Sequence, residues 1–256
     1  MIEKIVNQHF IPMFDVNKLS INCNNSNVRV MSTDGEKFIV RELMSRRNLK
    51  YMFKVDVTGD DLSISQEKYP RIPTLKFELQ VFIPKTFIGD VIISNHNGSI
   101  LLHDMTCQQL FITDNSGKIV LDDLKIRKGF FIQSRNGDIK LDNVWSRRFY
   151  LNSYSGMIKA VSLSGAGSVS SSSGYVQLDF EMISGNIVVN DTKGTVKVSM
   201  PEKDSYDFKL QSKVAEIKAP RTNLRHDRLE YKEGTVGNDP QYQLNVQTKS
   251  GRIKVK

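Results

Sequence analysis

The stretch TDNSGKIVLDDL, residues 113–124, joins two runs of alternating apolar residues through a Ser-Gly pair, and it decides the fold. Nineteen residues upstream the chain has SNHNGSILLHDM, and twenty residues downstream it has QSRNGDIKLDNV. A fixed spacing of this kind indicates a repeat architecture. The glycines of the five clearest copies are Gly98, Gly117, Gly137, Gly156 and Gly174.

The residues around each glycine follow the period of a β-strand. Asn or Ser precedes every one of these glycines, and apolar residues recur two and four positions after it and five positions before it. Side chains two apart on a strand face the same way, so these columns predict one buried stack of Ile, Leu and Val. The Asn-Gly or Ser-Gly pair predicts a tight turn, because glycine tolerates a positive φ.

Each copy is therefore expected to form strand, corner, strand and second corner. The prediction is an all-β protein, a parallel β-helix-like solenoid with rungs of ~19 residues that stack roughly 4.8 Å apart. A β-sandwich of regular hairpins is the alternative, but it does not explain why the same columns recur at a fixed spacing. Helical repeats need a longer unit, and no stretch shows a sustained helical period.

The two ends of the chain repeat less clearly. We expect residues 1–90 to form an N-terminal β cap and the first strands, because an open solenoid edge invites aggregation. Residues 91–256 would then hold the solenoid repeats, with a polar loop near 220–240. The Ser-rich segment 162–174 keeps the apolar spacing, which favours a rung of small residues over a linker. Gly185 and Gly194 are rival positions for the next corner.

Composition indicates an ordinary soluble chain with a basic surface. There are 36 Lys and Arg against 28 Asp and Glu, a net charge of +8, and residues 197–256 are the most basic part. Such a surface favours an anionic partner, although a basic surface without a function is also common. Cys23 and Cys107 form no CxxC pair and predict reduced core thiols. Because neither an export signal nor an apolar membrane span is evident, we expect a cytoplasmic protein, or one peripheral to the membrane.

Two pairs of cations recur at the same place in the repeat. Arg127 and Lys128 fall ten and eleven residues after their glycine, and Arg147 and Arg148 do the same in the next copy. Stacked rungs would bring the four charges together, where they repel unless acids or an anionic partner offset them. The pattern predicts a basic binding surface.

Three aromatic residues recur six positions before a glycine: Phe111, Phe131 and Tyr150. Their neighbours on both sides belong to the inward columns, so alternation predicts that the three point outward. An exposed aromatic ladder beside cations favours a glycan, an anionic polymer or the edge of a protein as ligand. Alternatively, the N-terminal region or a loop covers the ladder.

Acidic residues also recur in columns after the glycines. They resemble either a Ca²⁺ site or the paired carboxylates of a glycosidase. We favour turn formation, because a corner needs its residue in every rung whereas a site is usually unique. His96 and His103 lack an evident third metal ligand. With no catalytic constellation, we expect no enzyme activity, no cofactor and no metal. The acidic columns, with the histidine that shares the first, are Asp122, Asp142, Asp179 and His103, then Asp104 and Asp123.

The motifs resemble a known bacterial family. Recurrent Ser-Gly-x-Ile-x-Leu turns, VFIPK at 81–85 and VKVSMP at 196–201 are similar to the β-strand-repeat family of "putative adhesins", a domain of unknown function. The resemblance covers roughly residues 20–256. It implies a right-handed parallel β-helix-like fold and an envelope or scaffold role, and it offers no catalytic residues.

The sequence thus predicts a non-enzymatic scaffold or interaction protein. Its expected partner is an unidentified protein, an anionic polymer or a membrane surface, with no specific nucleic acid and no transmembrane segment. A second hypothesis is a carbohydrate-binding or carbohydrate-active β-helix protein that uses the acidic column. A third is self-association through the solenoid ends.

Overall fold

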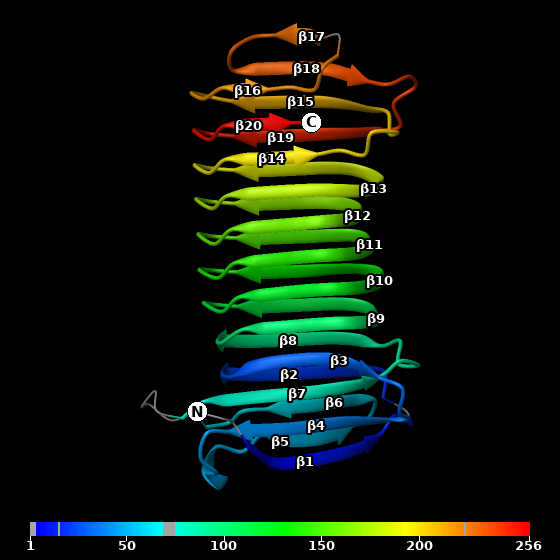
Figure 1. Cartoon of the computed structure of the whole chain (residues 1–256), viewed down its shortest axis with the longest axis vertical. Coiled ribbons are helices and arrows are strands. Elements are labelled where there is room, and N and C mark those ends of the chain that lie inside the picture. The colour runs from blue at the N-terminus through cyan, green and yellow to red at the C-terminus, as the bar shows by residue number, and fades with distance from the viewer. Residues whose placement is uncertain (1–3, 15, 69–74, 223) are drawn as a thin grey trace.

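The computed structural model describes residues 4–14, 16–68, 75–222 and 224–256. These ranges contain twenty strands and one short 3-10 turn, η1 (Leu49–Tyr51), so the all-β prediction is confirmed. The strands stack into a tall column with the N-terminal strands at one end and the C-terminal strands at the other (Figure 1). No helix in the described part of the chain is long and apolar enough to cross a membrane.

The middle of the column is a stack of parallel strands. Equivalent columns of the repeat are hydrogen-bonded neighbours, as when Ile119 pairs with Ile100 on one side and Ile139 on the other. This parallel register is the arrangement of a solenoid and excludes a sandwich of hairpins. Interruptions in the register divide each long strand into straight segments, which wrap around one core. The strands are β8 (Asp90–Asn97), β9 (Ile100–Asp114), β10 (Ile119–Ser134), β11 (Ile139–Ser153), β12 (Ile158–Ser171), β13 (Val176–Asp191) and β14 (Val196–Ser199).

At the N-terminal end the chain leaves the solenoid and returns to it. The β2–β3 rung pairs in parallel with β8 and β9 on one side and with β6 and β7 on the other. Antiparallel strands β1, β4 and β5 then cover this end. The strands are β1 (Lys4–Pro12), β2 (Lys18–Asn25), β3 (Asn27–Thr33), β4 (Lys37–Met44), β5 (Lys54–Thr58), β6 (Asp61–Ser65) and β7 (Phe77–Pro84).

The C-terminal end is built in the same way, with strands from elsewhere in the sequence joining the column and antiparallel strands covering it. The last two strands, β19 and β20, lie between the rung that ends in β14 and the rung formed by β15 and β16 (Figure 1). Antiparallel strands β18 and β17 cover that outer rung. The strands are β15 (Tyr206–Ser212), β16 (Ile217–Lys218), β17 (Leu224–Asp227), β18 (Tyr231–Val236), β19 (Tyr242–Thr248) and β20 (Ile253–Val255).

The structure adds detail to both ends of the sequence prediction. The segment near 220–240 contains the strands β17 and β18 as well as loop residues. In the N-terminal part that the structure describes, β1, β4 and β5 pair antiparallel, while β2 and β3 form a rung that pairs directly with β8 and β9. The hydrogen-bonded column is therefore continuous across residue 90.

The glycine column is explained by close contact and only once by a positive φ. Gly98 alone in this column has a positive φ, of 116°. A Cβ on Gly137 would overlap the carbonyl oxygen of Gly117 in the rung before it, and the same holds at each later corner. Glycine is required because the backbones of successive corners touch, so the predicted reason was wrong although the predicted residues were right. The column is completed by Gly117, Gly156, Gly174, Gly194 and Gly251.

The Ser-rich segment forms strand β12, as a rung of small residues should. A Cβ on Gly167 would overlap the carbonyl oxygen of Phe149 and crowd its ring. Small residues therefore leave room for Phe149, whose ring lies 6.0 Å from that of Phe130 and 6.0 Å from that of Phe180. Both cysteines are also in the core as free thiols, and burial raises the pKa of Cys107 to about 12.

A buried polar column lies three residues before each corner. Gly137 donates its backbone N–H to Ser134 Oγ at 2.9 Å, and Ser134 Oγ donates to the Gly137 carbonyl, also at 2.9 Å. These bonds satisfy backbone groups that the turn buries, which is why the column is hydroxyl-rich. The sequence prediction missed this column. Its members are Asn95, Asp114, Ser134, Ser153, Ser171, Asp191, Ser212 and Thr248.

Asp114 is an acid in this hydroxyl column. Its carboxylate accepts from the Gly117 backbone N–H, and only 6% of the residue is exposed. Burial penalises the ionised form and raises the pKa of Asp114 from 3.8 to about 6. The folded protein therefore holds this proton more tightly than the unfolded chain, and stability is lost as the pH rises through this interval.

Asp114→Asn should therefore stabilise the protein at neutral pH, by roughly 1–3 kcal/mol. Asparagine keeps the acceptor for Gly117 and adds a donor, as in the rung below, where Asn95 Nδ2 donates to the carbonyl of Gly98 at 3.0 Å. Urea unfolding at pH 4 and pH 7.5 measures the effect, which should nearly vanish at pH 4. Asp142→Asn, on an exposed side chain, is the control. An equal gain at both pH values would contradict the assignment to Asp114 ionisation.

Candidate binding surfaces

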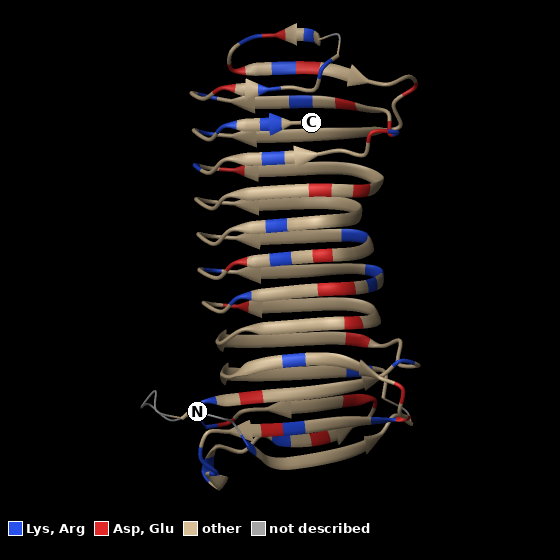
Figure 2. Cartoon of the chain, viewed as in Figure 1, with Lys and Arg blue, Asp and Glu red and all other residues tan. Residues whose placement is uncertain are grey.

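The four predicted cations lie together at one corner of the solenoid, here named the basic corner: Arg127 and Lys128 of β10, and Arg147 and Arg148 of β11. All four residues are exposed, and Figure 2 shows their blue segments at adjacent right-hand turns of the column. The register shifts by one residue here, with Gly129 against the backbone of Arg148. Ser146 Oγ donates to the Arg148 carbonyl at 2.9 Å and fixes the turn.

The basic corner has no acidic partner among the described residues. The ion pairs in the described part of the chain are formed by cations outside the basic corner, such as Lys18 with Asp61 and Arg29 with Glu78. Adjacent strands lie about 4.8 Å apart, so the stacked pairs repel one another across the rungs. An anion placed over the corner would relieve this repulsion.

The aromatic ladder consists of Phe111, Phe131 and Tyr150, and it follows directly after the basic corner. Phe131 pairs with Phe111 in one neighbouring strand and with Tyr150 in the other, so the three side chains stack on one outer face. Phe111 is 39% exposed and Tyr150 48% exposed, while Phe131 between them is half-buried. Because Arg148 and Tyr150 are two apart on a strand, they share this face.

A groove of about 770 Å³ lies on the other side of the basic corner. One rim is formed by residues that take the left-handed conformation at the first bend of each rung, with φ of 47° at Asp104, 54° at Asp123 and 50° at Asn143. Ser32 Oγ donates to Asp104 at 2.9 Å, and Asn143 Nδ2 donates to Asp123 at 2.6 Å. Acidic and amide residues thus form the first bend of these rungs, as expected if the acidic columns serve to form turns.

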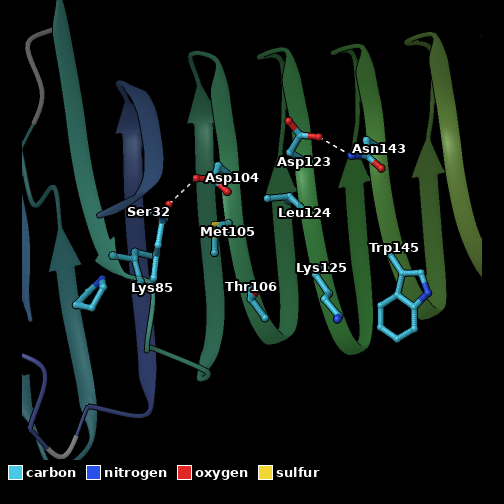
Figure 3. A pocket seen from close by; sticks show the side chains of 12 residues that line it. Ser32, Lys85, Asp104, Met105, Thr106, Asp123, Leu124, Lys125, Asn143 and Trp145 are labelled. Carbon is cyan, nitrogen blue, oxygen red and sulfur yellow. Dashed lines mark hydrogen bonds between the residues drawn. The ribbon is translucent and has the colours of Figure 1, made fainter. Parts of the chain in front are cut away.

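The floor of the groove is apolar, and its second rim carries a lysine and an aromatic ring. Met105 and Leu124 form an apolar floor and are almost fully buried. Lys125 Nζ lies 5.7 Å from the ring centroid of Trp145. The sequence interpretation missed this groove, although Trp145, the single tryptophan of the chain, was an available signal. Figure 3 shows Asp104, Asp123 and Asn143 in one row, Met105 and Leu124 below them, and Lys85, Thr106, Lys125 and Trp145 in another.

The acidic column just before this bend is mostly an outer surface. His103 Nδ1 lies 2.8 Å from Asp122 Oδ2, and Asp142 is exposed on the next rung. Among the described residues, His103, Asp122 and Asp123 are a group whose donor atoms lie within 4.8 Å of one another. This spacing would suit a cation, but the groups are at the surface, where histidine and carboxylate also pair without one. His96 is outside this group and lies near the end of strand β8, two residues before Gly98.

Comparison with known proteins agrees with the architecture. Among curated proteins, none matches this sequence. Solved structures of two proteins described as putative adhesins share the fold. The one from Bacteroides fragilis has a TM-score of 0.59 at 16% identity, with 98% of this chain and 96% of that chain covered. The one from Parabacteroides distasonis has a TM-score of 0.54 at 12% identity, with 97% and 96% covered. The family model Toastrack DUF4097 matches residues 16–256, so the chain belongs to the Toastrack DUF4097 family.

Proposed function

We propose that this protein is a non-enzymatic interaction module that binds an anionic polymer or an anionic membrane surface. The basic corner supplies the charge, and the aromatic ladder supplies an adjacent apolar contact. The observation that carries the proposal is the set of four exposed cations that lack an acidic partner in the described ranges. A solenoid holds these groups on a rigid backbone, so little conformational entropy is lost when a partner binds.

The geometry of the surface favours an extended partner over a small ion. The cations belong to two consecutive rungs, and the ladder spans three, so both run along the column axis. A polyanion or a layer of lipid headgroups presents several negative charges over such a length. Each cation near an anionic surface contributes on the order of 1 kcal/mol to the binding free energy. The contributions of the four cations add, and salt weakens them by screening the charges.

Charge reversal at the basic corner tests the proposal. Binding is measured by flotation with vesicles of phosphatidylcholine alone or mixed with phosphatidylglycerol, and by retention on immobilised polyphosphate. The wild type should bind at least one anionic support and should be released by salt. Arg127→Glu with Arg147→Glu should weaken binding by at least about tenfold, since two attractive charges become repulsive.

The matched control places the same change of charge elsewhere. Lys118→Glu with Lys193→Glu alters two exposed lysines beside the glycine corners, away from the basic corner. This variant should keep most of the binding. The proposal is overturned if the wild type binds neutral and anionic supports equally, or if both double variants lose binding to the same extent.

A further inference from the structure

The groove beside the basic corner has the size and composition of a small-molecule site. Its volume of about 770 Å³ falls within the range of ~300–1,000 Å³ that is usual for ligand pockets. It crosses β9, β10 and β11, with Pro84 and Lys85 at its N-terminal end. Because the strands repeat about every 4.8 Å, a ligand along the groove would meet the same three rows at each rung.

The aromatic side of the groove offers a stacking surface. Trp145 is half-buried and lines the groove together with Met105 and Leu124, the residues of its apolar floor. An indole face packs well against a flat apolar surface such as the C–H face of a sugar ring, and a polar group can bond at its edge. Lys125 Nζ, 5.7 Å from the centroid of this ring, adds a hydrogen-bond donor next to the stacking surface.

The opposite rim is a fixed row of acceptors. The bends that carry Asp104 and Asp123 have a left-handed backbone, and each carboxylate already accepts one hydrogen bond from a neighbouring rung. Each carboxylate has a second oxygen, and both residues are exposed. Carboxylates held in this way can accept hydrogen bonds from hydroxyl groups without moving, which favours a ligand rich in hydroxyl groups.

The formal charges of the residues that line the groove favour a neutral ligand. They sum to zero, with Lys85 and Lys125 against Asp104 and Asp123. Lys85 Nζ also lies 2.9 Å from Asp34 Oδ1, and Asp34 does not line the groove. An anion would meet the two carboxylates, and a cation would meet the two lysines. A peptide strand would need a free strand edge. Each of β9, β10 and β11 already pairs with a neighbouring strand on both sides.

We propose that the groove binds an uncharged oligosaccharide along the column axis, with one sugar ring on Trp145 and its hydroxyl groups on Asp104 and Asp123. This site is separate from the basic corner, so it stands independently of the proposed function. The two kinds of binding differ in a measurable way, because binding in the groove should be insensitive to salt.

The single tryptophan provides a direct test. Cellohexaose, maltohexaose and hexa-N-acetylchitohexaose, all uncharged, are titrated into the full chain while the emission of Trp145 is followed, and calorimetry gives the affinity. At least one of the three should shift the emission in a saturable way. Trp145→Ala should weaken that binding by at least about tenfold. Asp123→Asn should weaken it several-fold while keeping the bond from Asn143 and the left-handed bend, which asparagine tolerates.

Tyr175→Ala is the matched control, because Lys197 Nζ lies 5.2 Å from the Tyr175 ring outside the groove. It should bind as the wild type does, and so should Arg127→Glu with Arg147→Glu. Trp145→Phe keeps a stacking ring and should retain most of the affinity, which separates loss of stacking from loss of folding. The inference is overturned if none of the three sugars changes the Trp145 emission, or if Trp145→Ala and Asp123→Asn bind as the wild type does.

Discussion

Gly137→Ala should lower the free energy of unfolding by about 3 kcal/mol, although it adds a single methyl group. The new Cβ would overlap the Gly117 carbonyl oxygen, which belongs to the backbone of the adjacent rung and cannot rotate away. Relief requires the two corners to separate, and that strains the paired segments on both sides of the corner. Urea unfolding followed by far-UV circular dichroism measures the loss.

Gly35→Ala is the control for this substitution. Gly35 lies in a turn of the N-terminal cap, and a Cβ there would be 3.7 Å from Thr33 Oγ1, an ordinary contact. Its stability should change by no more than about 0.5 kcal/mol. If Gly137→Ala unfolded at the same urea concentration as the wild type, the corners would not touch as described and the stacking of the glycine column would be wrong.

The sequence was sufficient to predict the middle of the column, because there the local pattern and the three-dimensional contacts coincide. Residues two apart share a face, and residues one repeat apart become hydrogen-bonded neighbours, so Ile119 could be placed beside Ile100 and Ile139 by spacing alone. The outward direction of Phe111 and Tyr150 followed from the same alternation, as did the stacking of Arg127 near Arg147.

The ends could not be predicted in this way. Strands β2 and β3 join the solenoid next to β8 and β9, and strands β19 and β20 enter between rungs that precede them in the chain. Neighbours in sequence usually become neighbours in space, and both ends break that rule. The spacing of the repeat does not indicate which strand, distant in sequence, pairs between two rungs. The first described strand, β1, pairs with β4 at one end of the column, whereas β20, the last strand, pairs with both β14 and β16.

The groove was missed for a related reason. Its rows come from the same columns as the turns, so Asp104 and Asp123 were correctly read as corner residues and then set aside. Their second property, a fixed row of acceptors opposite Trp145, depends on how three rungs and the segment at Lys85 lie together. The buried column of Asp114 and Ser134 had a regular signal three residues before each glycine, but polar residues beside a turn are expected at the surface.

Phe149→Ala should cost about 3–5 kcal/mol, in the upper part of the range for single truncations in a core. The side chain is fully buried, its ring stacks on Phe130 at 6.0 Å, and it approaches Phe180 at the same distance. Gly167 in the next rung has no side chain that could fill the space. The cavity should therefore stay open, and chemical unfolding should show the full loss.

The neighbouring residue makes a sharp control. Tyr150→Ala removes a similar ring one position along β11, but that ring is 48% exposed on the outer face. Its loss should cost roughly 1 kcal/mol or less, since little apolar surface is returned to water. The two variants together test whether alternation along β11 assigns Phe149 to the core and Tyr150 to the binding surface. Equal losses of stability would mean that the register of this strand is wrong, and with it the placement of the aromatic ladder.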